Sequence, residues 1–437
     1  MGAPVPMQAS TVQLTTSEGS RRETSLLVGV VAAIVIRVIL LPINGGWGDL
    51  DQYAGWVHRL ATGLPFGAAY QLDMSYMPSL VAVFGALAHV VPGFATATDA
   101  GTPLVRVALK VPPLLADVAC AVGVYLLASG HRPGRAASAL AVLVVPASWY
   151  LSSLWGQYDT IYVVAAVWVA VLAVRDRGIA AGVLLGLALM TKPQALFLAV
   201  PFAAWMCARW QERRGVGVVL LACFVSAATW LPFASWGGLT DYLRNVAHYQ
   251  DVLFPFLSVQ AWNLWWLIQG ANGGASFISD STSLLGPITP RIIGFAMTFV
   301  AETLIALAMI RRPTRDRLLL GLTAATLVSF CLMTAMHERY AYGSLIFLAP
   351  LLARPAVRAT WAILAVTVTC NIVAAAPPNQ QPGSLIPLHG PVGTVGSIAM
   401  ILATILVLVL LVREGSDQPG SARRSADTGY GPAFAGG

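Results

Sequence analysis

The chain has 437 residues, of which 57% are hydrophobic and only 10% are charged, and its mean hydropathy is +0.72. This balance excludes a soluble globular domain, which would lack the polar surface needed to cover its core. A transmembrane β-barrel is excluded as well, because apolar residues run together for roughly 16–20 positions, the length of a spanning helix, instead of alternating with polar ones. The composition therefore predicts an all-α, polytopic membrane protein.

The apolar segments predict a bundle of about twelve transmembrane helices, within a range of about 11–13. In chain order the predicted spans cover residues 24–43, 104–128, 136–154, 159–174, 178–192, 194–208, 215–233, 290–310, 318–335, 341–353, 359–376 and 394–412. They leave two long loops, 44–103 and 234–289, and loops of this length are usually functional. Residues 78–94 are apolar enough for a thirteenth span. We interpret them as an interfacial or re-entrant helix, because a span there would invert every later loop.

Basic residues set the predicted orientation. Of the 26 Lys and Arg residues, 18 fall in short loops or tails on one side of the predicted spans. Cytoplasmic loops carry such an excess. This side is therefore predicted to be cytoplasmic, together with an N-terminal tail at 1–23 and a disordered tail at 413–437. The basic residues of the cytoplasmic loops explain the net charge of +7, so this charge does not indicate nucleic-acid binding. The domain 24–412 then carries both long loops on the outer face of the cell membrane.

The first long loop opens with two carboxylates, Asp49 and Asp51, directly after the first span. A carboxylate near the membrane surface is suited to act as a general base toward a hydroxyl group. Alternatively, Asp49 is the N-cap of a following helix. Asp73, later in the same loop, is a candidate substrate contact or a turn residue.

Two further polar motifs lie at predicted outer ends of spans. Trp155, Gln157 and Asp159 offer an indole face and hydrogen-bonding groups to a sugar, or else form an ordinary interfacial turn. Lys192 and Gln194 flank Pro193 in a tight outer turn. Lys192 is a candidate phosphate contact, or its side chain snorkels to the interface.

The most unusual motif is His337, Glu338 and Arg339, which follows the apolar run 318–335. Charges at such a depth are costly and persist where they face a cavity or a partner, so we predict the edge of an active site. Three cations placed within spans, Arg37, Arg106 and Lys110, are candidates for binding a lipid phosphate. For Lys110 the alternative is an intramembrane pair with Asp117.

The sequence resembles glycosyltransferases of the GT-C fold in a series of motifs that occur in the same order. These motifs are the Gly-Asp loop, Tyr76-Met77-Pro78, Trp155–Asp159, Lys192–Gln194, an Asn-Leu-Trp element and His337–Tyr340. The likeness covers residues 24–412 and is nearest to bacterial relatives of the second GPI mannosyltransferase. Relatives usually have Tyr-Pro-Pro at residues 76–78 and Leu-Tyr at residues 341–342, where this chain has Ala341-Tyr342. Both departures weaken any inference about the acceptor.

The resemblance implies a metal-independent, inverting transfer of a hexose from a polyprenyl-phosphate carrier, without a cofactor. Asp49 matches the family's base and Asp51 its neighbouring acid. His337 and Arg339 match donor-phosphate contacts oriented by Glu338. Mannose is favoured as the sugar by the likeness alone, and the acceptor is a glycolipid, a lipoglycan or a protein.

The main alternative is a transporter or flippase of a lipid-linked saccharide. The polar groups cluster at the ends of spans and no internal repeat is visible, which disfavours a transporter. The predicted partners are therefore a lipid-linked sugar donor, an acceptor and membrane lipids, without nucleic acid.

Overall fold

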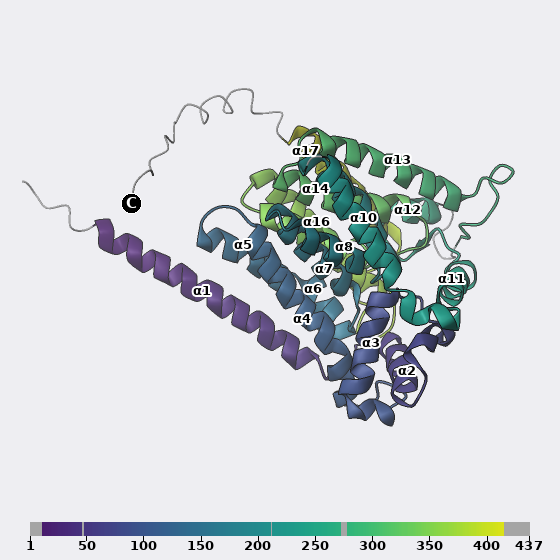
Figure 1. The fold of residues 1–437 in the computed structure, drawn as a ribbon. Coiled ribbons are helices and arrows are strands. Elements are labelled where there is room, and N and C mark those ends of the chain that lie inside the picture. The colour runs from purple at the N-terminus through teal and green to yellow at the C-terminus, as the bar shows by residue number, and fades with distance from the viewer. Residues whose placement is uncertain (1–10, 46–47, 211, 272–277, 415–437) are drawn as a thin grey trace, which may run out of the picture.

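The computed structural model describes residues 11–45, 48–210, 212–271 and 278–414, most of them in helices (Figure 1). The first part of the chain forms α1 (Thr11–Leu40), α2 (Asp49–Ala61), η1 (Phe66–Leu72), α3 (Pro78–Val90), η2 (Pro92–Ala95), α4 (Pro103–Leu127), α5 (Arg132–Val144), α6 (Pro146–Trp149), the π-helix η3 (Tyr150–Trp155), α7 (Asp159–Val174), α8 (Gly178–Leu189), η4 (Pro193–Leu198) and α9 (Ala199–Arg209).

The second part forms α10 (Glu212–Ala228), η5 (Leu231–Trp236), α11 (Gly238–His248), the π-helix η6 (Tyr249–Leu253), β1 (Ser258–Val259), α12 (Leu264–Ala271), α13 (Pro290–Arg311), α14 (Arg315–Leu332), β2 (Met336–His337), α15 (Tyr342–Leu348), η7 (Ala349–Leu351), α16 (Pro355–Ala375) and α17 (Gly390–Arg413). Strands β1 and β2 pair in parallel, with Ser258 opposite Met336. The predicted N-terminal tail lies partly in α1, and residues 1–10 and 415–437 lie outside the described residues.

Several helices begin at a recognisable local signal. Thr102, Thr289 and Thr314 are the N-caps of α4, α13 and α14, and each hydroxyl accepts a hydrogen bond from a backbone amide of the first turn. In α4 and α13 the next residue is proline, whose fixed φ suits the first helical position.

The core of the bundle is centred on α14, which packs against α13, α15 and α17 and is buried along nearly its whole length. A second group of neighbours is α4, α5, α7 and α8. At the periphery, α1 lies along the side of the bundle beside α5 (Figure 1). From Leu27 to Ile39 its described exposed side chains are large and apolar in most positions, and Phe299 of α13 and Leu402 of α17 are exposed as well. Such a surface requires an apolar surrounding, which a bilayer provides.

Among the described residues, five helices are long and apolar enough to cross a membrane, namely α4, the helix from Arg213 to Trp236, α13, α16 and α17. A sixth span results if α5 and the segment Pro146–Trp155, which meet at a bend of 49°, act together. The remaining predicted spans fall in the apolar part of α1 from Thr24 to Leu40, in α7, in α8, in η4 with α9, in α14 and in α15 with η7. The predicted all-α, multi-pass membrane class is therefore confirmed, whereas the number of twelve spans stays a prediction.

The two segments predicted as long loops are largely helical. Residues 44–103 contain α2, η1, α3 and η2, which bury an aromatic cluster around Tyr53, Phe84 and Tyr158. Helix α3 has 13 residues and is about 20 Å long, which is less than the ~30 Å hydrocarbon core of a bilayer. This length favours the interpretation of residues 78–94 as a helix that does not span.

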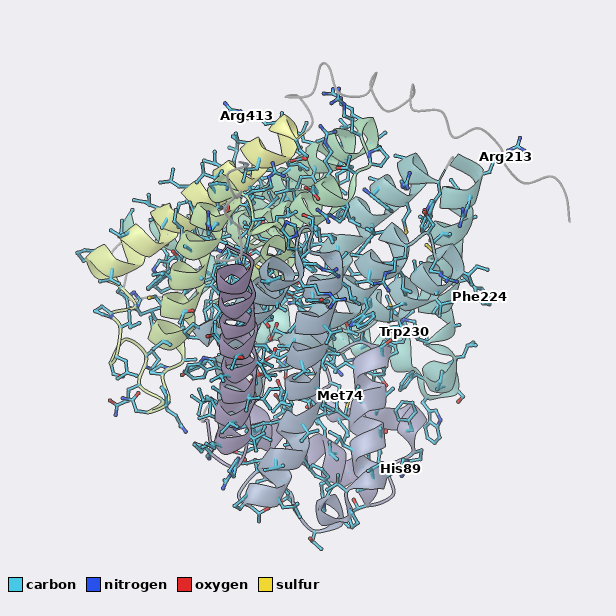
Figure 2. The ribbon with its side chains drawn as sticks, turned by 90° about the vertical axis from the view of Figure 1, so that its left-hand side faces the viewer. Met74, His89, Arg213, Phe224, Trp230 and Arg413 are labelled. Atoms are coloured by element: carbon cyan, nitrogen blue, oxygen red, sulfur yellow. The ribbon has the colours of Figure 1, made fainter. Side chains whose placement is uncertain are left out.

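The ends of the bundle differ in chemistry. Figure 2 shows Arg213 and Arg413 at the top of the molecule, and Met74 and His89 in its lower half. At the top, Arg354 lies 3.6 Å from the Asp316 carboxylate and also pairs with Glu414. We call this the basic end, and the opposite end, formed by α2 and α3, the Asp49 end.

Candidate active site

Asp49 is the first residue of α2 and enters the helix from Gly48, whose φ of +72° lies in the left-handed region that favours glycine. The N-cap position is therefore occupied by Gly48, and the alternative prediction of Asp49 as the N-cap is wrong. Oδ2 of Asp49 accepts a hydrogen bond from Nε1 of Trp155 at 2.9 Å. The predicted base and the predicted sugar-binding indole are therefore in direct contact.

Trp155 ends the π-helix η3, a rare form of helix that is frequently found at functional sites. The chain then turns through Gly156, whose φ is +87°. The backbone amides of Gly156 and Gln157 both donate to the carbonyl of Leu151. This compact turn places Trp155 and Asp159, the first residue of α7, at the same end of the bundle.

Asp159 is completely buried between two cations. Its Oδ1 accepts a hydrogen bond from Nζ of Lys192 at 2.8 Å, and its Oδ2 lies 3.3 Å from Nε of Arg339. The second contact is an ion pair without hydrogen-bond geometry, since both Oδ2 and Nε lack a hydrogen-bond partner among the described residues. The three predicted motifs around residues 155–159, 192–194 and 337–339 thus converge on one carboxylate.

The His337–Arg339 motif follows the bundle core and is fixed by β-pairing with β1. Nη1 of Arg339 donates to Glu338 Oε1 at 2.7 Å, and the guanidinium carbon lies 5.1 Å from the centre of the Trp155 ring. Asp49 and Arg339 therefore contact the same indole, one at its N–H and the other at its face.

Charge and burial in this motif shift two pKa values. Burial opposes ionisation of Glu338, but the adjacent Arg339, assisted by His337, outweighs it and lowers the pKa of the carboxyl group to about 2. Burial and Arg339 lower the pKa of His337 below its usual 6.5. At neutral pH the motif therefore contains an ionised Glu338, a neutral His337 and a cationic Arg339.

Aromatic residues that sequence reasoning did not select complete the site. Nζ of Lys192 lies 4.9 Å from the ring centre of Tyr340 and 5.6 Å from that of Tyr76, within cation–π range. Phe254 packs edge-on against the His337 ring at 4.8 Å. Tyr76 lies in the Tyr76-Met77-Pro78 motif and Tyr340 in the His337–Tyr340 motif. Membership of these motifs is the sequence signal that would have identified both residues as parts of the site.

The second long segment joins this site through the turn at residues 249–254. The Tyr249 hydroxyl accepts a hydrogen bond from Gln52 of α2 at 2.7 Å, and Phe254 contacts His337. This turn therefore bridges the helix that carries Asp49 and the strand that carries His337.

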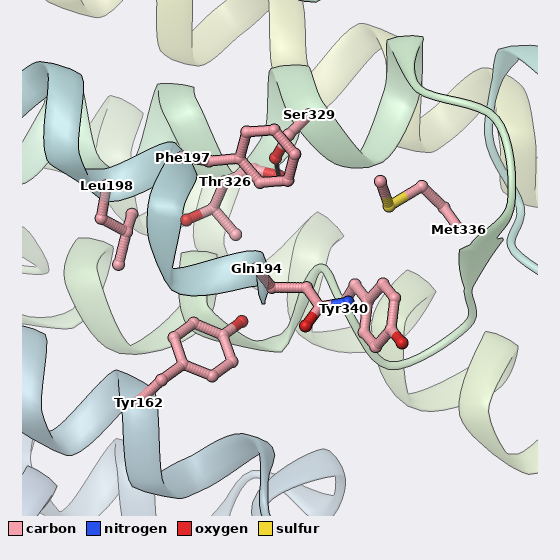
Figure 3. Close-up of a pocket in the computed structure, with 8 residues that line it drawn as sticks. All are labelled: Tyr162, Gln194, Phe197, Leu198, Thr326, Ser329, Met336 and Tyr340. Atoms are coloured by element: carbon pink, nitrogen blue, oxygen red, sulfur yellow. Dashed lines mark hydrogen bonds between the residues drawn. The ribbon is translucent and has the colours of Figure 1, made fainter. Parts of the chain in front are cut away.

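Gln157 and Gln194 each bury a polar atom that has no partner among the described residues. Gln157 is completely buried, its Oε1 receives a long hydrogen bond from Tyr53 at 3.4 Å, and its Nε2 is unpaired. Oε1 of Gln194 lines a small cavity with Tyr340, Tyr162 and Ser329 (Figure 3). The cavity has room for about a single water molecule and is too small for a hexose.

Three predicted residues lie apart from this cluster. Asp51 is exposed and accepts a hydrogen bond from the backbone of Ala100 at 2.9 Å. Asp73 is exposed at the end of η1 with a φ of +56°. Arg106 donates to the backbone carbonyls of Pro42, Ala100 and Gly101. Asp51 and Arg106 thus hold backbone groups around the segment 44–103, and among the described residues no hydrogen bond or ion pair joins any of the three to Trp155, Asp159 or Arg339.

The predicted pairing of Lys110 with Asp117 is wrong. Arg37 forms the ion pair with Asp117 at 3.2 Å, and its other hydrogen bonds go to Ser148 and to the carbonyls of Ala33 and Leu143. Lys110 donates to backbone carbonyls instead. Both cations are completely buried, so the structure does not present them to a lipid phosphate.

Because Arg37 is the cation paired with Asp117, its removal leaves a buried carboxylate without a counter-charge. We expect Arg37→Met to destabilise the protein by about 3–5 kcal/mol. The measurement is thermal unfolding of the purified protein in detergent. Arg37→Met combined with Asp117→Asn is expected to recover part of the loss, and equal stability of wild type and Arg37→Met would contradict the pairing.

The lowered pKa values also predict acid sensitivity. Glu338 stabilises the fold above its unfolded-state pKa of 4.5, and this stabilisation, at most about 3 kcal/mol, is lost as pH falls from 4.5 toward 2. His337 acts in the same direction, because the unfolded chain binds its proton at higher pH than the folded chain. In detergent, the unfolding temperature should fall on acidification, and less steeply in Glu338→Gln.

Within the described residues, no group of three or more His, Cys, Asp and Glu side chains is placed to hold a metal ion. The reactive groups of the cluster are carboxylates, cations, one imidazole and aromatic rings. A carboxylate such as Asp49 can accept a proton. Cations such as Arg339 and Lys192 can stabilise an anion nearby.

The glycosyltransferase family 87 model matches residues 107–335. This match covers just over half of the chain, and the chain belongs to glycosyltransferase family 87. The expectation of a membrane glycosyltransferase is thereby confirmed. The matched region contains Trp155, Asp159 and Lys192 but neither Asp49 nor Arg339.

Among solved structures, the crystal structure of ArnT from Cupriavidus metallidurans bound to undecaprenyl phosphate is similar, with 14% sequence identity. The alignment covers 90% of this chain and 77% of that chain, with a TM-score of 0.48. A likeness this distant carries over neither a substrate nor a residue role. No curated protein sequence matches the chain.

Proposed function

We propose that this membrane glycosyltransferase moves a hexose, with mannose favoured, from a polyprenyl-phosphate carrier to a hydroxyl group of an acceptor outside the cytoplasmic membrane. The glycosyltransferase class rests on the family. The lipid-linked donor and the choice of mannose rest on the motif resemblance, and a glycolipid, a lipoglycan or a protein fits as acceptor.

One observation carries the proposed mechanism, namely the shared contact of Asp49 and Arg339 with Trp155. The N–H edge of the indole holds the Asp49 carboxylate, and the ring lies under the Arg339 guanidinium. A proton acceptor and an anion-binding group are thereby held on two sides of one rigid ring. An inverting transfer needs a base and an anion-binding group on opposite faces of the sugar carbon, and Asp49 and Arg339 are the two groups that we assign to these roles.

In the proposed step, Asp49 removes the proton of the acceptor hydroxyl, and the acceptor oxygen bonds to the anomeric carbon of the sugar. The bond from that carbon to the phosphate oxygen breaks, and its electron pair leaves with the polyprenyl phosphate. Arg339 and the neutral His337 stabilise the charge that develops on this phosphate. The Nη1 donors of Arg339 already serve Glu338 and His337, so its Nη2 is the group we assign to the phosphate.

Lys192 has a different proposed role from the predicted direct phosphate contact. Its ammonium group is buried and bonded to Asp159 at 2.8 Å. It fixes the carboxylate that lies beside Arg339, and its positive charge adds to the local potential. We infer that Gln157 uses its unpaired Nε2 to donate to a sugar hydroxyl, because leaving a buried amide unpaired costs about 1–3 kcal/mol.

The distribution of charge supports an outward-facing site. The labelled arginines of the basic end lie away from Met74 and His89 (Figure 2), and basic loops mark the cytoplasmic side. With this orientation both termini are cytoplasmic and the Asp49 end faces outward. A transporter is the alternative function.

The test is a transfer assay with membranes that contain the protein and radiolabelled polyprenyl-phospho-mannose. Transfer of label into a glycolipid, lipoglycan or protein fraction is expected, and the glucosyl and arabinosyl donors serve as the specificity controls. Sealed vesicles that translocate the labelled lipid without transferring sugar would support the transporter and overturn the enzyme.

A further inference from the structure

We propose that Lys110 is a positioning residue that sets the distance between Asp49 and Trp155. Its ammonium group is completely buried and donates to the carbonyl of Ile43 at 2.6 Å and to that of Leu154 at 2.6 Å. A third, longer contact reaches the carbonyl of Leu40 at 3.5 Å. An ammonium has three N–H donors, so these carbonyls account for all of them.

The two short bonds connect the segments that carry the Asp49–Trp155 contact. Leu154 immediately precedes Trp155, and Ile43 lies six positions before Asp49. Helix α4, which carries Lys110, thereby ties the end of α1 to the end of η3. Neither tie involves a substrate group.

Gly45 brings the same two segments into backbone contact. A Cβ atom at residue 45 would lie 2.0 Å from the carbonyl oxygen of Leu154, the atom that also accepts from Lys110. A backbone atom cannot move aside as the end of a flexible side chain does. Any side chain at residue 45 must therefore push the backbone of residue 45 away from that of Leu154 and Trp155.

Gly156 makes room for the lysine stem on the other side. A Cβ atom at residue 156 would lie 3.1 Å from Cγ of Lys110 and 2.7 Å from Cδ2 of Leu50, and its φ is +87°. The carbonyl of Leu154 is thus surrounded by three residues, Lys110, Gly45 and Gly156, which we call the clamp. The clamp explains why a cation is buried in α4 without an acidic partner.

The kinetic consequence rests on the proposed function of Asp49 as base. A displacement of about 1 Å at the reacting groups costs on the order of 10²-fold in rate. Lys110→Met is therefore expected to lower kcat by about 10²-fold, with the KM for the lipid-linked donor changed less than about threefold. Lys110→Arg, which keeps donors for both carbonyls, is expected to recover part of the rate.

Arg135→Met is the matched control, because Arg135 also donates to a backbone carbonyl, that of Tyr125, but near the far end of α4. It is expected to keep kcat and KM near wild type. A normal kcat in Lys110→Met would show that Lys110 has no role in catalysis. A loss of activity caused mainly by a higher KM for the donor would indicate direct substrate contact. Either result would overturn the positioning role.

A second measurement separates this inference from the proposed function. Hydrogen–deuterium exchange of purified protein without substrate should rise at residues 43–49 and 154–156 in Lys110→Met and in Gly45→Ala, but not in Asp49→Asn or Arg135→Met. If the wild type transfers no sugar while these amides respond as expected, the proposed function fails and the clamp stands. Unchanged exchange in both Lys110→Met and Gly45→Ala overturns the clamp whatever the activity. Should Lys110→Met fail to fold, Gly45→Ala, which keeps the charge, decides alone.

Discussion

Asp49→Asn is expected to reduce sugar transfer by about 10³-fold while the protein stays folded. General-base catalysis contributes about 10²–10⁴-fold, and an amide cannot take up the proton of the acceptor hydroxyl. The asparagine carbonyl can still accept the hydrogen bond from Trp155 that Asp49 accepts at 2.9 Å. The loss should therefore fall on kcat, with little change in donor KM or unfolding temperature. Initial rates with a labelled lipid-linked donor measure it.

Asp51→Asn and Asp73→Asn are the matched controls. Asp51 is exposed and accepts a hydrogen bond from Ala100, which an asparagine oxygen also does. Asp73 has a positive φ of 56°, which asparagine tolerates as well as aspartate. Both variants should keep most of the transfer rate. If Asp49→Asn keeps full activity and one of the two controls loses most of it, the aspartate changed in that control is the base and Asp49 is not.

The sequence predicted those features that depend on local pattern. The apolar runs located helices such as α4, α7 and α13 to within a few residues, because a spanning helix satisfies its own backbone and needs no partner to be recognised. The cost of burying charge predicted that Glu338 and Arg339 belong to a site. In the structure Arg339 pairs with Glu338 and lies beside Asp159 and Trp155.

Pairings between distant residues were not predictable in this way. Helical spacing placed Lys110 and Asp117 on one face of α4, yet Asp117 pairs with Arg37, 80 residues away in the sequence. The partners of Lys110 are backbone carbonyls, and a carbonyl acceptor leaves no signal in the sequence because every residue has one. The pairing of β1 with β2 likewise joins residues 258 and 336 and so could not be inferred from either two-residue strand.

Arg339→Gln is expected to cause the largest loss of stability in the site, about 3–5 kcal/mol. Arg339 is the partner of Glu338 at 2.7 Å and of Asp159 at 3.3 Å, and both carboxylates are buried. Without the guanidinium, Glu338 stays buried with only the neutral His337 beside it, whereas Asp159 keeps Lys192. Denaturant unfolding of the purified protein in detergent measures the change. Arg244→Gln is the control, since the Arg244–Asp241 pair is exposed and is worth at most about 1 kcal/mol.

A double-mutant cycle with Glu338→Gln tests whether the loss arises from the buried pair. Removing both partners leaves no unpaired charge at residue 338, so the double variant should be more stable than Arg339→Gln alone, with a coupling energy of about 0.5–3 kcal/mol. Its transfer activity should nevertheless stay as low as that of Arg339→Gln, because the proposed phosphate contact is not restored. Additive effects on stability would contradict the pairing, and recovery of transfer in the double variant would show that Arg339 serves Glu338 and not the donor phosphate.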